Sequence, residues 1–252
     1  MKALMKNWPY PKYIAHRGAG KIAPENTLSA FRVGASYGYR MFECDVKLSS
    51  DGVPFLLHDD TLARTTDGSG VAGQMPWEAL SRLDAGTWHS RSFAGEPLPT
   101  FDAIAQYCLA NHYALNIELK PTEGGAAVER RTGEVVAKRA LQLWQNEATP
   151  PFLSSFKPES LAGAMQAAPS LPRGLLLEEL WDGWLEKSVA LDCIAVICDY
   201  KLWNAKTVAA VKAKGMKCLS YTVNDAANAN KLWALGTDGI ITNAIDLFAP
   251  SA

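Results

Sequence analysis

The chain alternates between short, nearly continuous apolar runs and longer segments in which apolar residues recur at helical spacing. The first pattern is typical of buried strands and the second of amphipathic helices. We expect strands at 13–18, 41–48, 114–120, 151–156, 173–178, 193–200, 217–224 and 239–243. Strands this apolar are buried on both faces, as in a parallel sheet covered by helices. Eight alternating units predict an α/β fold of the (β/α)8 TIM-barrel type, with the active site where the strands end.

Residues that start or stop helices stand between these runs. Leu28, Phe31 and Ala35 fall at helical spacing, and Gly38 sits where such a helix would stop. Asp225 fits an N-cap. Further helices are expected near 101–111, 127–146, 158–168, 181–191, 204–214 and 225–235.

A turn-rich region interrupts the alternation after the second predicted strand. Val53–Leu57 is a further extended run, and Asp67–Gly70 and Asp84–Gly86 then have the composition of turns. We interpret residues 59–99 as an insertion, because a segment of this length is too short for a large core of its own. The expected organisation is one domain over residues 1–252 that contains this insertion.

Composition narrows the possible classes of function. The 252 residues carry a formal net charge of −1, which gives no electrostatic case for binding nucleic acid or inserting into an anionic membrane. No apolar run approaches membrane-spanning length, and residues 1–9 lack the apolar core of a secretory signal. The five cysteines are odd in number and lack a Cys-x-x-Cys pair, which argues against a disulfide framework or zinc site. We therefore expect a cytoplasmic protein.

Three acidic residues lie near the ends of predicted barrel strands. Glu43 and Asp45 are two residues apart on one strand, so both carboxylates share a face, and Glu118 is near the end of the next barrel strand. Carboxylates that converge without Cys or His ligands suit a hard cation, Mg²⁺ or Ca²⁺. The alternative is a set of separate salt bridges, for example with Lys47 and Lys120.

Two histidines also follow short apolar runs. His16 and Arg17 follow Tyr13–Ala15, and His58 follows Phe55–Leu57. Two histidines at such positions can supply one general acid and one general base, and an arginine offers a planar fork of donors for phosphate. The remaining histidines, His89 and His112, are interpreted as surface or structural residues.

Lys120 lies two residues after Glu118 and shares its face. It can bind phosphate and stabilise developing negative charge, or it can be a structural partner of one of the acids. A third interpretation is a Schiff-base aldolase that uses Lys120. This activity fits a barrel but gives no role to the two histidines and Arg17.

A different motif match is rejected. Gly18–Ala23 fits the dinucleotide fingerprint G-x-G-x-x-G/A, and Glu43 is near its expected acidic position. That fold needs a helix that opens at the second glycine, whereas Pro24, Asn26 and Thr27 delay the helix here.

The ordered motifs of the chain resemble those of glycerophosphodiester phosphodiesterases, most closely the short cytoplasmic bacterial members. The resemblance covers about residues 13–243. It rests on His16-Arg17-Gly18, Ala23-Pro24-Glu25-Asn26-Thr27, Glu43-x-Asp45-Val46, Asp51-Gly52, His58-Asp59, Leu62-x-Arg64-Thr65-Thr66, Asn116-x-Glu118-x-Lys120 and Tyr221-Thr222-Val223-Asn224.

The resemblance implies a TIM barrel with residues 59–99 as its insertion. It implies hydrolysis of glycerophosphodiesters, such as glycerophosphocholine and glycerophosphoethanolamine, to sn-glycerol 3-phosphate and an alcohol, a reaction of lipid and glycerol metabolism. The implied site residues are Glu43, Asp45 and Glu118 for one divalent cation, His16 and His58 as the acid–base pair, and Arg17 and Lys120 for phosphate.

Two aromatic residues are expected near the substrate. Tyr221 stands where many members of the family carry tryptophan, which leaves the shape of the glycerol or leaving-group pocket open. Phe156 either lines the same pocket or belongs to the core. A non-catalytic barrel that binds a phosphate ligand is the alternative from another class of function, and the sequence leaves open whether the protein is a homodimer.

Overall fold

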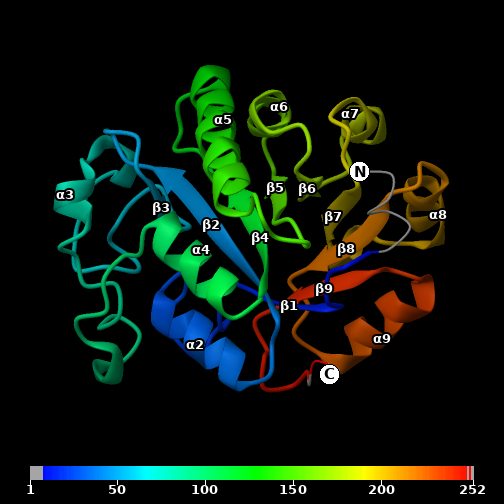
Figure 1. Cartoon of the computed structure of the whole chain (residues 1–252). Coiled ribbons are helices and arrows are strands. Elements are labelled where there is room, and N and C mark those ends of the chain that lie inside the picture. Colours follow the sequence, from blue (N-terminus) through cyan, green and yellow to red (C-terminus); the bar gives the residue numbers. More distant parts are fainter. Residues whose placement is uncertain (1–7, 249, 251–252) are drawn as a thin grey trace.

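Eight parallel strands close into a barrel in the computed structural model, which describes residues 8–248 and 250 (Figure 1). They are β1 (Tyr13–Ala15), β2 (Met41–Leu48), β4 (Ala114–Leu119), β5 (Phe152–Ser155), β6 (Arg173–Leu177), β7 (Ala195–Asp199), β8 (Lys217–Tyr221) and β9 (Gly239–Thr242). They pair in the order β1-β9-β8-β7-β6-β5-β4-β2, and a pairing of Ala15 with Phe42 joins β1 to β2. The predicted (β/α)8 TIM barrel is confirmed. The prediction about a secretory signal rests mainly on residues 1–7, which lie outside the described residues.

Helices connect the strands on the outside of the barrel (Figure 1). They are α2 (Leu28–Ser36), α4 (Phe101–Ala110), α5 (Ala126–Leu143), α6 (Pro158–Ala167), α7 (Trp184–Ala190), α8 (Ala205–Ala213) and α9 (Ala226–Leu235). Asp225 caps α9 as predicted, because its side chain accepts a hydrogen bond from the backbone of Asn228. Several predicted boundaries are wrong. Gly183, in the left-handed conformation, delays the start of α7, and α5 ends before Trp144, which packs into the core. Strands β1 and β8 each end three residues earlier than predicted.

The side chains that face the barrel interior are apolar at one end of the barrel and polar at the other. The lower interior is filled by an apolar cluster that includes Ile14, Met41, Phe152, Leu176, Leu219 and Ile241. Above it, towards the carboxyl ends of the strands, the interior carries polar side chains. Cys44 faces the outer core between strands and helices, as the alternation along β2 predicts. The packed base thus supports a polar mouth, where TIM barrels have their active sites.

The insertion begins with a strand that runs back along β2. β3 (Pro54–Leu56) is antiparallel to β2 and is followed by η1 (Ala72–Gln74), α3 (Trp77–Leu80) and η2 (Arg91–Phe93). Its apolar side chains form a small separate cluster of Phe55, Leu57, Leu62, Ala72, Leu80, Ala85 and Leu98. The backbone N–H of Leu57 donates to the carbonyl of Asp45, so the chain returns to the barrel mouth just before His58. The limits of the domain and of its insertion stay predictions.

Two further findings concern membrane-spanning helices and the cysteines. Within residues 8–248 and 250, we find no helix that is both long and apolar enough to span a membrane. All five cysteines are buried free thiols. The cytoplasmic location stays a prediction.

Candidate active site

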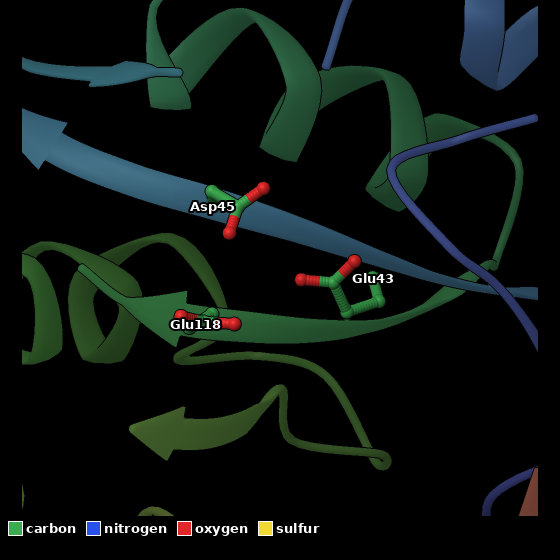
Figure 2. Close-up of side chains that lie close together, drawn as sticks. All are labelled: Glu43, Asp45 and Glu118. Carbon is green, nitrogen blue, oxygen red and sulfur yellow. The ribbon is translucent and has the colours of Figure 1, made fainter. Parts of the chain in front are cut away.

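Three buried carboxylates meet at the barrel mouth. Glu43 and Asp45 project from β2 and Glu118 from β4, and their carboxyl groups lie around a shared space between the two strands (Figure 2). The register pairs Asp45 with Glu118, and one oxygen from each of the three residues lies within 4.8 Å of the others. The predicted convergence of the acids is therefore present in the fold.

Burial and the close packing of like charges raise the pKa values of two of these carboxyl groups. Burial raises the pKa of Glu43 well above its usual value, and the charges of Asp45 and Glu118 raise it further. Burial and Asp45 raise the pKa of Glu118 to about 7. Glu43 Oε1 is also buried without a hydrogen-bond partner among residues 8–248 and 250. A hard divalent cation fits this all-oxygen cluster, because it would accept the free lone pairs and offset the repulsion.

Two cationic side chains flank only part of the cluster. Arg17 Nε lies 3.2 Å from Asp45 Oδ2, while Lys120 Nζ lies 3.1 Å from Glu118 Oε1 and 3.7 Å from Asp45 Oδ1. Although burial alone would raise it, these cations hold the pKa of Asp45 well below its usual range. Lys47, the other candidate partner, forms an ion pair with Asp60 at 2.6 Å. The alternative of separate salt bridges therefore accounts for Lys120 but gives Glu43 no ion pair with a lysine or arginine side chain among residues 8–248 and 250.

The environment of Lys120 also bears on the aldolase interpretation. Burial lowers the pKa of Lys120, but Glu118 and Asp45 outweigh that effect, and the net shift is upward. A Schiff-base lysine needs a lowered pKa to be a nucleophile at neutral pH. The arrangement therefore disfavours an aldolase.

The loop after β1 holds the carboxylates in place. The backbone N–H of Arg17 donates to Glu43 Oε2 at 3.0 Å, in a backbone conformation with φ of 51°. Asn26 donates through Nδ2 to Asp45 Oδ2 at 2.8 Å and accepts from the backbone N–H of Asp45 at 3.1 Å. Gly20 lies so close to the backbone of Asn243 that a Cβ atom would collide with it, so this glycine permits the loop to pack against the chain after β9.

His16 lies beside the carboxylates with one ring nitrogen already engaged. Nδ1 is 2.6 Å from Asn243 Oδ1, which leaves Nε2 facing Glu43 Oε2 at 3.7 Å. Burial lowers the pKa of His16 to about 4, and the nearby charge of Arg17 acts in the same direction. His16 is therefore neutral at pH 7, and because an amide oxygen accepts the Nδ1 proton, the Nε2 lone pair is free.

His58 reaches the same mouth from the insertion. Its Nδ1 is 2.7 Å from Asp59 Oδ1, and Asp59 is in turn held by Arg64 through two hydrogen bonds of 2.6 and 2.9 Å. Burial lowers the pKa of His58, and the charges of Arg17 and Lys120 act in the same direction. The carboxylates of Asp45 and Asp59 oppose this shift only in part, so the pKa stays below its usual value. The other two histidines lie away from the cluster: His89 contacts the carbonyl of Lys21, and His112 is exposed after α4.

The side chains border two connected hollows. A cavity of about 150 Å³ is lined by His16, Arg17, Glu43, His58, Asn116, Glu118, Ser154, Phe156, Leu176, Tyr221, Thr222 and Ile241. Phe156 and Tyr221 both border it, with ring centroids 5.6 Å apart, and the Tyr221 hydroxyl donates to the carbonyl of Leu177. A wider groove of about 680 Å³ adjoins the cavity, and the two share His58, Glu118 and Phe156.

Several residues of the site had no assigned role at the level of sequence. Asn26, Asp59 and Arg64 occur in the motifs of the family resemblance, yet their contacts with Asp45, His58 and Glu25 depend on the folded loops. Asn243 follows β9, so its position after a barrel strand was the available signal. Asn116 shares a strand face with Glu118, and that spacing was the signal for placing it in the cavity.

Replacing Glu118 with glutamine will change how stability depends on pH in the metal-free protein. An acid whose pKa is raised on folding stabilises the fold below its unfolded value, here 4.5, and this contribution is lost as the pH rises through about 7. The free energy of unfolding of Glu118→Gln minus that of the wild type should therefore increase between pH 4.5 and 7, by on the order of 1–3 kcal/mol.

Chemical denaturation of both proteins in a chelating buffer at several pH values measures this difference. His16 acts with the opposite sign in part of the same range, because its pKa is lowered, but it is present in both proteins and its effect cancels. A difference that stays constant from pH 4.5 to 7 would show that Glu118 does not titrate in the repulsive environment described.

Comparison with known proteins identifies similar sequences and folds. The sequence model described as the Glycerophosphoryl diester phosphodiesterase family matches residues 16–247. A glycerophosphodiester phosphodiesterase of Caldanaerobacter subterraneus is 31% identical over 231 residues, which cover 91% of this chain and 93% of that protein.

Solved structures show the same similarity. An Oleispira antarctica phosphodiesterase in complex with the product sn-glycerol-3-phosphate is 32% identical, with a TM-score of 0.87 and 95% of each chain covered. A glycerophosphodiester phosphodiesterase of Agrobacterium tumefaciens is 28% identical, with a TM-score of 0.78 and coverage of 95% of this chain and 99% of that one.

Proposed function

This chain belongs to the glycerophosphoryl diester phosphodiesterase family, and we propose that it hydrolyses glycerophosphodiesters to sn-glycerol 3-phosphate and an alcohol with the help of one divalent cation. The observation that carries the proposal is one cavity lined by both histidines, Arg17 and two carboxylates. Asp45 completes the carboxylate cluster, and Lys120 lies 3.1 Å from Glu118. The product found in the Oleispira antarctica relative supports the same substrate class.

The proposed cation is Mg²⁺ or Ca²⁺, held by Glu43, Asp45 and Glu118. When bound, such an ion offsets the charge of a phosphodiester and lowers the pKa of a coordinated hydroxyl. The free Glu43 Oε1 and the raised pKa of Glu118 support this assignment, because the first is an unsatisfied acceptor and the second reflects burial of Glu118 beside the charge of Asp45. Arg17 and Lys120 would contact the phosphate oxygens, and their positive charge would stabilise the charge that develops in the transition state.

The surroundings of the two histidines suggest different roles. His16 is neutral, with Nε2 free to accept a proton, so we assign it as the base that takes the proton of the 2-hydroxyl of glycerol. His58 pairs through Nδ1 with the carboxylate of Asp59, which opposes part of the lowering of its pKa by burial, and it borders the wide groove, so we assign it as the acid for the leaving alcohol. The 2-hydroxyl oxygen would bond to phosphorus as the bond to the leaving oxygen breaks, giving a cyclic phosphate. Water would then open the ring, with the two histidines in exchanged roles.

The wide groove would receive the leaving alcohol. It borders His58 and not His16, which agrees with His58 as the acid. Its three lysines are each paired with a carboxylate: Lys47 with Asp60, Lys120 with Glu118 and Lys157 with Glu129. A groove this large, with its lysines already paired, would select only weakly among leaving alcohols. Glycerophosphocholine and glycerophosphoethanolamine should therefore both be substrates.

Turnover of glycerophosphocholine by the wild type and two variants tests the proposal. The wild type should release sn-glycerol 3-phosphate and choline, whereas His16→Ala and His58→Ala should each lower kcat by about 10²–10⁴-fold, the usual effect of a positioned acid or base. His89→Ala is the matched control, because its ring contacts the backbone of Lys21 outside the cavity. A folded wild type that binds substrate without turnover would favour the non-catalytic barrel, and wild-type rates in either variant would show that the wrong pair was chosen.

A further inference from the structure

The floor of the cavity carries a polar group that the proposed chemistry does not use. Asn116 lies on β4 two residues before Glu118, so it faces the same interior but sits deeper in the barrel. The residue is 1% exposed and lines the cavity of about 150 Å³. The amide oxygen accepts a hydrogen bond from Ser154 Oγ at 2.9 Å. The amide nitrogen, Nδ2, is buried and has no hydrogen-bond partner within the described part of the chain.

The chemistry around Asn116 indicates which kind of group would satisfy Nδ2. A buried N–H donor without an acceptor is unfavourable, and folded proteins contain few of them. The strand register places Glu43 beside Asn116, and its carboxylate would repel a phosphate at this depth. Leu176 and Ile241 line the same cavity and offer apolar contact to a carbon chain. A neutral hydroxyl on a short carbon chain therefore fits this position.

The depth of Asn116 in the barrel indicates which hydroxyl of the glycerol moiety would reach it. Asp45 and Glu118 form the upper level, and Glu43 and Asn116 form the level below it, about 6.6 Å away along the tilted strands. A phosphate bound at the level of Arg17 and Lys120 would allow the glycerol chain to extend inward, with its 1-hydroxyl, the group farthest from phosphorus, at the lower level.

We propose that Asn116 Nδ2 donates a hydrogen bond to the 1-hydroxyl of the glycerol moiety, and that this contact selects glycerol-containing phosphodiesters. The inference rests on the proposed function, because it uses the same cavity and substrate. Asn116 is then a residue that determines specificity, and Ser154 orients its amide. A site built to bond a hydroxyl discriminates strongly against the analogue that lacks it, because the buried donor is left without a partner.

A comparison of two substrates and three proteins tests this contact. The substrates are glycerophosphocholine and its 1-deoxy analogue, 2-hydroxypropyl phosphocholine, which keeps the 2-hydroxyl. The wild type should lose about 10²-fold in kcat/KM on the analogue. Asn116→Ala should lose about as much on glycerophosphocholine, yet stay within about threefold of the wild type on the analogue. Ser154→Ala should show intermediate discrimination, because it keeps the donor but loses its orientation.

The outcomes separate this inference from the proposed function. Equal losses of Asn116→Ala on both substrates would mean a structural role and would overturn the inference. If that variant fails to fold, inhibition of the wild type decides: sn-glycerol 3-phosphate should inhibit at least about tenfold more tightly than 1,2-propanediol 1-phosphate, and equal inhibition overturns the contact. Wild-type hydrolysis of both substrates at equal rates overturns the inference alone, whereas no hydrolysis of glycerophosphocholine overturns the proposed function itself.

Discussion

Removal of divalent cations from the purified protein will abolish the release of sn-glycerol 3-phosphate from glycerophosphocholine, and added Mg²⁺ or Ca²⁺ will restore it. The reason is the imbalance of charge at the barrel mouth. Arg17 and Lys120 contact Asp45 and Glu118, but Glu43 remains buried with a free oxygen in the described structure. Without a cation the three acids repel both one another and the anionic phosphodiester, so the substrate is disfavoured where it must react.

The experiment has a second readout that does not depend on turnover. Binding of the ion to the folded state should raise the melting temperature of the chelated wild type, because a ligand that binds only the folded state stabilises it. Glu43→Gln is the matched variant, since it keeps the size of the side chain and removes one anionic ligand. It should lose most of that thermal shift together with its activity. Full turnover after exhaustive chelation would contradict the metal assignment and would leave Arg17 and Lys120 as the only charge stabilisers.

The identity of the carboxylate cluster could be predicted because it depends on a simple periodicity. Residues two apart on a strand share a face, so the spacing of Glu43 and Asp45 already placed both in the barrel interior. Neighbouring parallel strands end at one edge, which added Glu118. The same reasoning predicted all eight barrel strands, since each is a buried run between helices.

The features that could not be predicted from the sequence depend on loops and on contacts between residues distant in the chain. His58 reaches the mouth because β3 turns back along β2, and a pattern of apolar residues does not give the direction of such a strand. The contact of His16 with Asn243 joins residues 227 positions apart, and only closure of β1 against β9 creates it. Element ends were also less certain, as at α7, because a single glycine conformation decides where the helix begins.

A glycerophosphodiester that lacks the 2-hydroxyl will bind to the enzyme but will not be cleaved. In the proposed first step that hydroxyl attacks phosphorus from within the same molecule, which has an entropic advantage over attack by an outside water. His16, neutral and with Nε2 unprotonated, is suited to accept its proton, and His58 faces the groove through which the alcohol leaves. Glu43 Oε2 lies 3.7 Å from His16 Nε2, so a cation held by the carboxylate cluster would favour ionisation of the hydroxyl beside this base.

Glycerophosphocholine, glycerophosphoethanolamine and the 2-deoxy analogue of glycerophosphocholine should be assayed side by side with the metal-loaded enzyme. The first two should turn over at rates within about tenfold of each other, because the wide groove has its lysines paired and imposes little selection on the alcohol. The 2-deoxy compound should inhibit competitively, which shows that it occupies the cavity, and should release no choline. Its kcat would remain measurable if water attacked directly, since the phosphate, the acid and the base would all still be in place. Cleavage of the 2-deoxy compound at a comparable rate would therefore assign the nucleophile to water, with the 2-hydroxyl only a binding group.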